Sequence, residues 1–163
     1  MSNGPSERPM TLRTRALVRT MHLVWRVTRG MTLGVRAAVL DESGRVFLIR
    51  HTYTPGWYLP GGGVEPGETA LDALTRELAE EALVVPTAEP ALHGVFFNRT
   101  ISPRDHVVCY VVRDFRMLGE KRPDREIAES GFFSLDALPE GTTGATRRRL
   151  AEILDGRERS AEW

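Results

Sequence analysis

Polar and hydrophobic positions near the start of the chain follow a helical period. Residues 12–29 place basic side chains at steps of three and four, with apolar side chains on the opposite side, which predicts an amphipathic helix. The basic stripe consists of Arg15, Arg19, His22, Arg26 and Arg29. Its apolar face can pack on its own domain or on a second subunit, as in a homodimer. Contact of the basic face with an anionic membrane surface or an acidic partner is the less favoured alternative.

From Thr32 the period changes to that of strands. Residues 33–50 form two apolar runs around the turn at 41–44, and we expect a hairpin. Residues 51–63 are rich in glycine and proline and predict a loop whose backbone approaches another group. An acidic helix with Thr69 as its N-cap follows. The remaining expected elements are strands at 92–99 and 106–113, a short strand near 131–134, and a closing helix over about 143–154.

The length, the composition and the order of the predicted elements indicate the fold class and the domain organisation. Strands flanked by two long helices predict one α/β or α+β sandwich, which suits a chain of 163 residues. We expect an N-terminal segment at 1–30, a main domain at 31–157 and a C-terminal tail at 158–163. Cys109 is the only cysteine, and the sequence shows neither a membrane span nor a secretion signal. These features favour a cytoplasmic protein.

The charge is unevenly distributed although the formal net charge is zero. Residues 1–36 contain seven arginines and one glutamate, a formal +6, so the rest of the chain carries −6. An acidic main domain makes nucleic-acid binding improbable, because such binding normally needs a basic face. We expect the Arg147-Arg148-Arg149 run of the closing helix to be a solvated face.

The acidic helix carries three carboxylates at neighbouring surface positions. Glu77, Glu80 and Glu81 stand at i, i+3 and i+4, beside an apolar stripe that can be buried while the acids face a cleft. Such a set suits a hard cation such as Mg²⁺, and Arg76 can bridge to Glu80. A merely solvated acidic face is the alternative. The glycine loop at 61–63 favours a ligand site, because backbone there can come close to a bound group.

These residues resemble the box of the Nudix hydrolases, G-x5-E-x7-R-E-U-x-E-E-x-G-U with U aliphatic. Eight of its nine specified places are filled in order, and Leu83 stands where the box has its second glycine. The matching residues are Gly62, Glu68, Arg76, Glu77, Leu78, Glu80, Glu81 and Val84. The resemblance implies an α/β/α sandwich with a mixed sheet, to which the N-terminal helix is an addition. Because a leucine resists positive φ, we expect the helix to end a residue or two later, before Pro86.

The resemblance also implies a function. Nudix enzymes use Mg²⁺, for which Mn²⁺ can substitute, to hydrolyse a diphosphate linkage in a nucleoside diphosphate joined to a group X. By position, Glu77 and Glu81 resemble the principal metal ligands, with Glu80 as a further or water-mediated ligand. The carbonyl of Gly61 completes the set, and Glu68, Arg76 and Gly62 resemble supporting residues. The alternative is a Nudix-fold module that binds a nucleotide and regulates a partner without catalysis.

The general base and the substrate contacts are less defined by the motif. We prefer a box glutamate as the base. The alternatives are acids of a later segment, namely Glu120, Asp124, Glu126 and Glu129. Arginines suit phosphates and aromatic rings can stack on a base, so the expected substrate contacts are Arg50, Tyr53, Trp57, Arg99 and Arg104. None of the four histidines has metal-ligand spacing, and we interpret them as structural or surface residues.

Overall fold

The computed structural model describes residues 18, 20, 21, 24 and 30–163. The chain divides into two compact units, Met1–Met31 and Thr32–Trp163. In the first unit residues 18, 20, 21 and 24 are helical, and the rest of the predicted amphipathic helix lies outside the described residues. Within the described part of the chain, no helix combines the length and the apolar character needed to cross a lipid bilayer.

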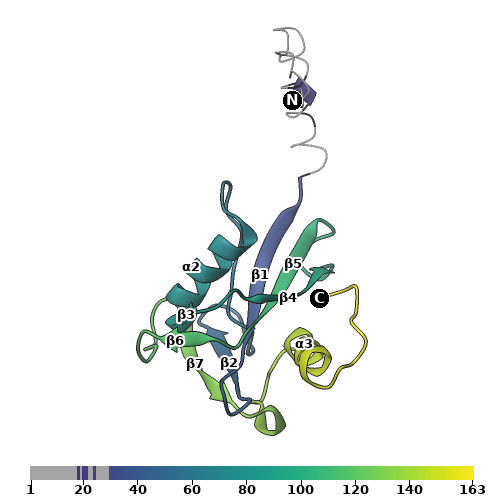
Figure 1. Ribbon diagram of the computed structural model, residues 1–163. Helices are drawn as coiled ribbons and strands as arrows, with labels where there is room; N and C mark the ends of the chain where they lie inside the picture. Colours follow the sequence, from purple (N-terminus) through teal and green to yellow (C-terminus); the bar gives the residue numbers. More distant parts are fainter. Residues whose placement is uncertain (1–17, 19, 22–23, 25–29) are drawn as a thin grey trace, which may run out of the picture. The chain divides into compact units, whose positions relative to one another are not determined.

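The second unit is built on a mixed sheet, which confirms the predicted α/β class (Figure 1). Strand β1 (Thr32–Val39) pairs in parallel with β5 (Asp105–Val112), and β5 pairs antiparallel with β4 (Ala91–Phe97). Strand β2 (Val46–His51) pairs antiparallel with β7 (Ile127–Phe133). Both strands predicted near residues 92 and 106 are therefore present, and they are neighbours.

Two short strands and the helices complete the unit. Strand β3 (Val84–Pro86) pairs antiparallel with β6 (Phe115–Met117), and the sequence pattern predicted neither. The acidic helix is α2 (Ala70–Ala82), and the closing helix is α3 (Gly144–Leu154). A short 3-10 helix, η1 (Leu135–Ala137), precedes α3.

The predicted hairpin at residues 33–50 is wrong, although its two strands exist. A single bridge between Leu40 and Val46 closes the turn. Beyond it the two strands do not pair with each other: β1 pairs with β5, and β2 pairs with β7. The side chains of both strands are almost entirely buried near the turn. Strands covered on both faces lie in the interior of a layered fold, whereas a hairpin of a two-layer protein usually keeps one face in water.

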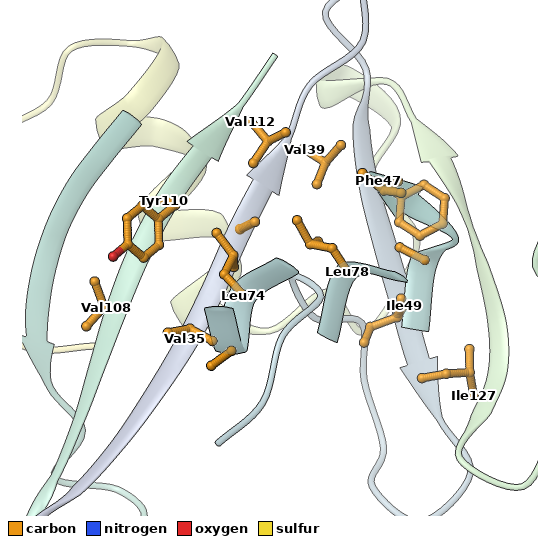
Figure 2. Close-up of a cluster of buried hydrophobic side chains, with 14 residues drawn as sticks. Val35, Val39, Phe47, Ile49, Leu74, Leu78, Val108, Tyr110, Val112 and Ile127 are labelled. Atoms are coloured by element: carbon orange, nitrogen blue, oxygen red, sulfur yellow. The ribbon is translucent and has the colours of Figure 1, made fainter. Parts of the chain in front are cut away.

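Alternate side chains of β1 and β2 enter two separate apolar clusters. Val35, Val39 and Ile49 belong to the cluster that packs on Leu74 and Leu78 of α2, shown in Figure 2. The opposite face supplies the second cluster, on the side of α3, which includes Ala38, Leu40, Val46, Leu48, Trp57, Phe96 and Leu150. Since successive strand residues point to opposite faces, this division places α2 and α3 on the two sides of the sheet layer.

Helix α2 begins as predicted and ends differently. The Thr69 side chain accepts a hydrogen bond from Asp72 N, and the Asp72 side chain accepts one from Thr69 N. The helix ends at Ala82, and Leu83 adopts φ 53° and ψ 34°, the left-handed conformation expected of a glycine. The predicted later end is therefore wrong. Leu83 O accepts a hydrogen bond from Leu118 N at 2.7 Å, so pairing of the next strand with β6 fixes the end at this residue.

The prediction that residues 147–149 form a solvated face is wrong for Arg149. Arg147 and Arg148 are exposed, whereas Arg149 is completely buried. Its guanidinium carbon lies 3.8 Å from the centroid of the Phe96 ring, and Nη2 lies 2.5 Å from Glu152 Oε1. A buried arginine is tolerated here because a carboxylate and an aromatic face both compensate its charge.

The predicted C-terminal tail packs against β4. Phe97 N donates to Ala161 O at 2.9 Å, and Trp163 N donates to Phe97 O at 2.9 Å. The Trp163 ring contacts the Phe96 ring edge to face, with centroids 5.8 Å apart. These contacts bring residues 161–163 to the edge of the sheet beside the N-terminal end of α3.

Candidate active site

Arg76 ties the loop before α2 to the helix itself. Its Nε and Nη2 donate to the two carboxylate oxygens of Glu68 at 2.8 and 3.0 Å, and Nη1 donates to Glu77 Oε1 at 2.7 Å. Nη2 also donates to Gly63 O at 3.1 Å. These hydrogen bonds lower the pKa of Glu68 to about 2, so its carboxylate stays ionised. The predicted contact with Glu80 is longer, at 3.6 Å.

The loop next to α2 requires glycine at residue 61 and brings Gly62 close to Glu77. Gly61 has φ 136°, and a Cβ on it would collide with the Val35 carbonyl oxygen. A Cβ on Gly62 would collide with the carboxylate of Glu77. The absence of both side chains lets the loop backbone reach the acids of α2. Gly61 N donates to Glu81 Oε2 at 2.7 Å as a result.

Glu81 is a buried carboxylate, with 7% of the residue exposed. Burial raises its pKa to about 7, and the charges of Glu77 and Glu126 act in the same direction. The Gly61 N–H and the charge of Arg36 oppose this rise. An ionised carboxylate in such a setting is costly unless a cation compensates it. A cation bound beside Glu81 would therefore stabilise its ionised carboxylate.

The carboxylate oxygens of α2 are of the type that binds a hard divalent cation. In the structure, however, they do not converge on one point. Among the residues that the structure describes, no three His, Cys, Asp or Glu side chains converge as a finished metal site. Glu77 is turned toward Arg76, Glu81 toward Gly61, and the Glu80 side chain is 63% exposed. Glu77 and Glu81 nevertheless border the same loop and offer the oxygen ligands that Mg²⁺ prefers. A third carboxylate would require rotation of the exposed Glu80 side chain.

A cleft of about 650 Å³ borders this loop, and we call it the glycine-loop cleft. Gly62 and Gly63 line one side, the first turn of α3 and Trp163 line another, and Arg36 and Arg148 also border it. None of the five predicted substrate residues lines this cleft. Their expected contact with the substrate stays a prediction.

Three of the predicted substrate residues border a second cleft of about 590 Å³, which we call the Tyr53 cleft. Arg50, Tyr53 and Trp57 line it, and Arg50 Nη2 contacts Glu129 Oε1 at 2.6 Å. The other two, Arg99 and Arg104, are exposed and line neither cleft. Arg99 and Arg104 lie in the turn between β4 and β5, whereas Arg50 lies on β2, which pairs with β7 in a different sheet.

The structure also separates the four later acids. Asp124 accepts hydrogen bonds from Glu126 N and Ile127 N and contacts Lys121 at 2.5 Å, so it holds its own loop. Glu129 is paired with Arg50, and Glu120 is exposed. Only Glu126, among these four, has a charge that affects the pKa values of Glu81 and Tyr53.

Sequence reasoning missed Arg36 and Trp163 as parts of the site. Arg36 interrupts an apolar strand, a signal that could have marked it, and its Nη1 donates to Leu59 O at 3.0 Å. Trp163 carried no signal, because only the return of the chain to β4 brings it to the glycine-loop cleft.

Comparisons with known proteins show which family the chain resembles. The model of the NUDIX domain matches residues 30–153. An ADP-ribose pyrophosphatase of Methanocaldococcus jannaschii is 34% identical over 104 residues, which cover 62% of this chain and 61% of that protein. A MutT-like protein of Streptomyces ambofaciens is 30% identical over 125 residues, 77% of this chain and 78% of the relative. The chain thus spans about three-fifths of the length of the archaeal relative.

Solved structures show the same fold. A MutT Nudix hydrolase from Burkholderia pseudomallei superposes with a TM-score of 0.64 at 29% identity, covering 75% of this chain and 97% of that one. An ADP-ribose pyrophosphatase from Streptococcus suis superposes with a TM-score of 0.57 at 29% identity, covering 80% of this chain and 96% of the other.

Proposed function

The chain belongs to the Nudix family, and from this premise we propose that it is a metal-dependent diphosphatase. Its substrate is a nucleoside diphosphate joined to a group X, and water attacks phosphorus and breaks the diphosphate linkage. The observation that carries the proposal is the buried Glu81 carboxylate, held at the Gly61 backbone beside Glu77. This concentration of negative charge is unfavourable without a cation, and it would bind a divalent cation.

Mg²⁺, or Mn²⁺ in its place, would be held by Glu77, Glu81 and Glu80 together with the carbonyl of Gly61. When bound, the cation would neutralise charge on the diphosphate and lower the pKa of a bound water. Arg76 and Glu68 keep the loop and α2 in register, because their hydrogen bonds connect the two segments. The protein residues thus hold two ligand-bearing segments at a fixed separation.

The glycine-loop cleft is the proposed place for the substrate. Its volume of about 650 Å³ lies within the range of small-molecule sites. Arg36 and Arg148 can bind phosphate oxygens, and the Trp163 ring offers a face on which a base can stack. The names of the relatives, among them an ADP-ribose pyrophosphatase, support a nucleoside diphosphate derivative as the class of substrate. They leave X unassigned.

We assign the general base to Glu126 in preference to a box glutamate. All three box glutamates are assigned to the metal here, and Arg76 and Gly61 already hold one oxygen each of Glu77 and Glu81, so a base outside the box is preferred. Glu126 is exposed and lies near enough to Glu81 to affect its pKa. It can therefore accept the proton of a water activated beside Glu81.

The test is monophosphate release from a panel of nucleoside diphosphate derivatives in the presence of Mg²⁺. We expect turnover of at least one compound, and Glu81→Gln should lower kcat at least about a hundredfold. Glu126→Gln should lower kcat about a hundredfold with little change in KM. The matched control is Glu89→Gln, which neutralises an exposed glutamate in the turn before β4.

The outcomes separate the alternatives. Equal rates for wild type and Glu81→Gln would contradict the metal-dependent mechanism. If no compound were hydrolysed while nucleotides raised the melting temperature, the chain would instead be a nucleotide-binding module.

A further inference from the structure

His51 ends β2 in the interior of the molecule, although its sequence context indicated a structural or surface residue. It is 9% exposed, and its Nδ1 is buried without a hydrogen-bond partner. The imidazole stacks on the Tyr53 ring at 5.0 Å and contacts the Tyr58 ring at 5.6 Å between centroids. The two aromatic rings therefore restrict the orientation of the His51 imidazole, and its Nδ1 has no hydrogen-bond partner.

The open nitrogen faces the carboxylate of Glu81. Nδ1 lies 3.9 Å from Glu81 Oε1, and both side chains are more than nine-tenths buried. This distance is too long for a direct hydrogen bond. Two metal–ligand bonds of about 2.1 Å each can span up to about 4.2 Å, so both atoms can bind one ion. A buried polar atom without a partner is unfavourable, and a shared ion would remove that cost.

The chemistry of the two donors differs from that of an oxygen-only site. An imidazole nitrogen that carries no proton offers a lone pair to a metal ion. Mg²⁺ takes oxygen ligands almost exclusively, whereas imidazole binds first-row transition metals. The Tyr53 cleft, which His51 borders, provides an entry path from solvent.

We propose that His51 Nδ1 and Glu81 Oε1 are two ligands of one divalent-cation position, and that the imidazole makes this position prefer a first-row transition metal to Mg²⁺. The inference rests on the proposed role of Glu81 as a metal ligand. It adds a nitrogen ligand from a different element and a preference among cations. Water molecules would supply the remaining ligands.

The first test uses the unmodified chain loaded with Mn²⁺. Electron spin echo envelope modulation should detect a ¹⁴N nucleus coupled to the ion, with the coupling of a bound imidazole. Coordination by oxygen alone would overturn the inference and would leave the proposed hydrolysis untouched. Because this measurement needs no variant, a folding defect cannot obscure it.

The second test compares cation affinities in two histidine variants. His51→Leu should weaken Mn²⁺ binding at least about tenfold and change Mg²⁺ binding little. His106→Leu is the matched control, because His106 Nδ1 is also buried without a partner, but this histidine lies on β5 and its ring contacts Phe97 of β4. Calorimetric titration measures both cations in each variant.

Equal losses for Mn²⁺ and Mg²⁺ in His51→Leu, or the same loss in His106→Leu, would overturn the nitrogen ligand. If the wild type bound neither cation, the proposed function would fail together with this inference. Oxygen-only coordination in a chain that still hydrolyses its substrate would contradict the inference alone.

Discussion

Glu81 is a carboxylate in the interior, and the position of its proton should affect the stability of the metal-free protein. Burial raises its pKa in the folded chain from 4.5 to about 7. A raised pKa means that the ionised form disfavours folding, so this residue's contribution to stability is fully present below pH 4.5 and falls as pH rises through 7. The shift corresponds to roughly 3 kcal/mol at most between these limits.

Glu81→Gln should therefore change stability in a pH-dependent way. Both proteins are measured in the presence of a chelator. The difference in free energy of unfolding, variant minus wild type, should be roughly 2–3 kcal/mol larger at pH 8 than at pH 5. Glutamine keeps an oxygen for the Gly61 N–H and carries no charge at either pH. Urea unfolding at the two pH values measures the difference. Parallel pH dependence of the two proteins would contradict the buried, proton-sensitive carboxylate.

At the scale of elements, the end of α2 combines a strained residue with a useful hydrogen bond. Leu83 is the one non-glycine with positive φ in the described part of the chain. This conformation costs a leucine about 1–2 kcal/mol. Its N–H donates to Leu78 O and its carbonyl accepts from Leu118 N, so the strained residue joins the helix to the β3–β6 pair.

Replacement of Leu83 tests this account of the helix end. Leu83→Gly should stabilise the protein by about 0.5–1 kcal/mol, because relief of strain exceeds the added entropy of the unfolded chain. Leu83→Val should destabilise it by about 1 kcal/mol, since a β-branched residue resists this conformation more strongly. Chemical denaturation gives both values. Leu118→Gly, at a residue with ordinary φ, is the control and should destabilise.

The elements that the sequence predicted are those with local causes. Thr69 caps α2 through a neighbour three residues away, and the spacing of the α2 acids follows from the helix period. Pairing of β1 with β5 depends on residues about seventy positions apart, which no local pattern encodes. Arg149 looked like a solvated residue for the same reason, because Phe96 and Trp163, which cover it, come from other segments.

The site follows the same division between local and distant contacts. The Nudix box predicted Glu77, Glu80 and Glu81 because one helix carries all three. The approach of His51 to Glu81 joins β2 to α2, and the glycine-loop cleft joins β1 to α3 and the end of the chain. A local motif can therefore propose metal ligands on one helix, whereas the residues that line the clefts come from segments far apart in the chain.

At the scale of the whole molecule, the two apolar clusters lie entirely within one unit. Every described residue of both clusters falls between Val35 and Trp163, and the compact unit begins at Thr32. The family model also begins at residue 30. The folding free energy of the catalytic unit should therefore come from residues 32–163, and the basic N-terminal segment should add another property, such as contact with a partner.

Removal of residues 1–30 tests this division. The shortened chain should unfold within about 3 °C of the full chain, which corresponds to a change of about 1 kcal/mol, and should keep its kcat. Size-exclusion chromatography with light scattering of both proteins shows whether the segment forms a homodimer, and liposome sedimentation shows whether it contacts an anionic membrane. Loss of folding or of turnover in the shortened chain would show that residues 1–30 complete the core or the site. Unchanged folding with a smaller assembly would instead place the apolar face of the predicted helix between subunits, because the mass of the particle would then depend on a segment that the catalytic unit does not need.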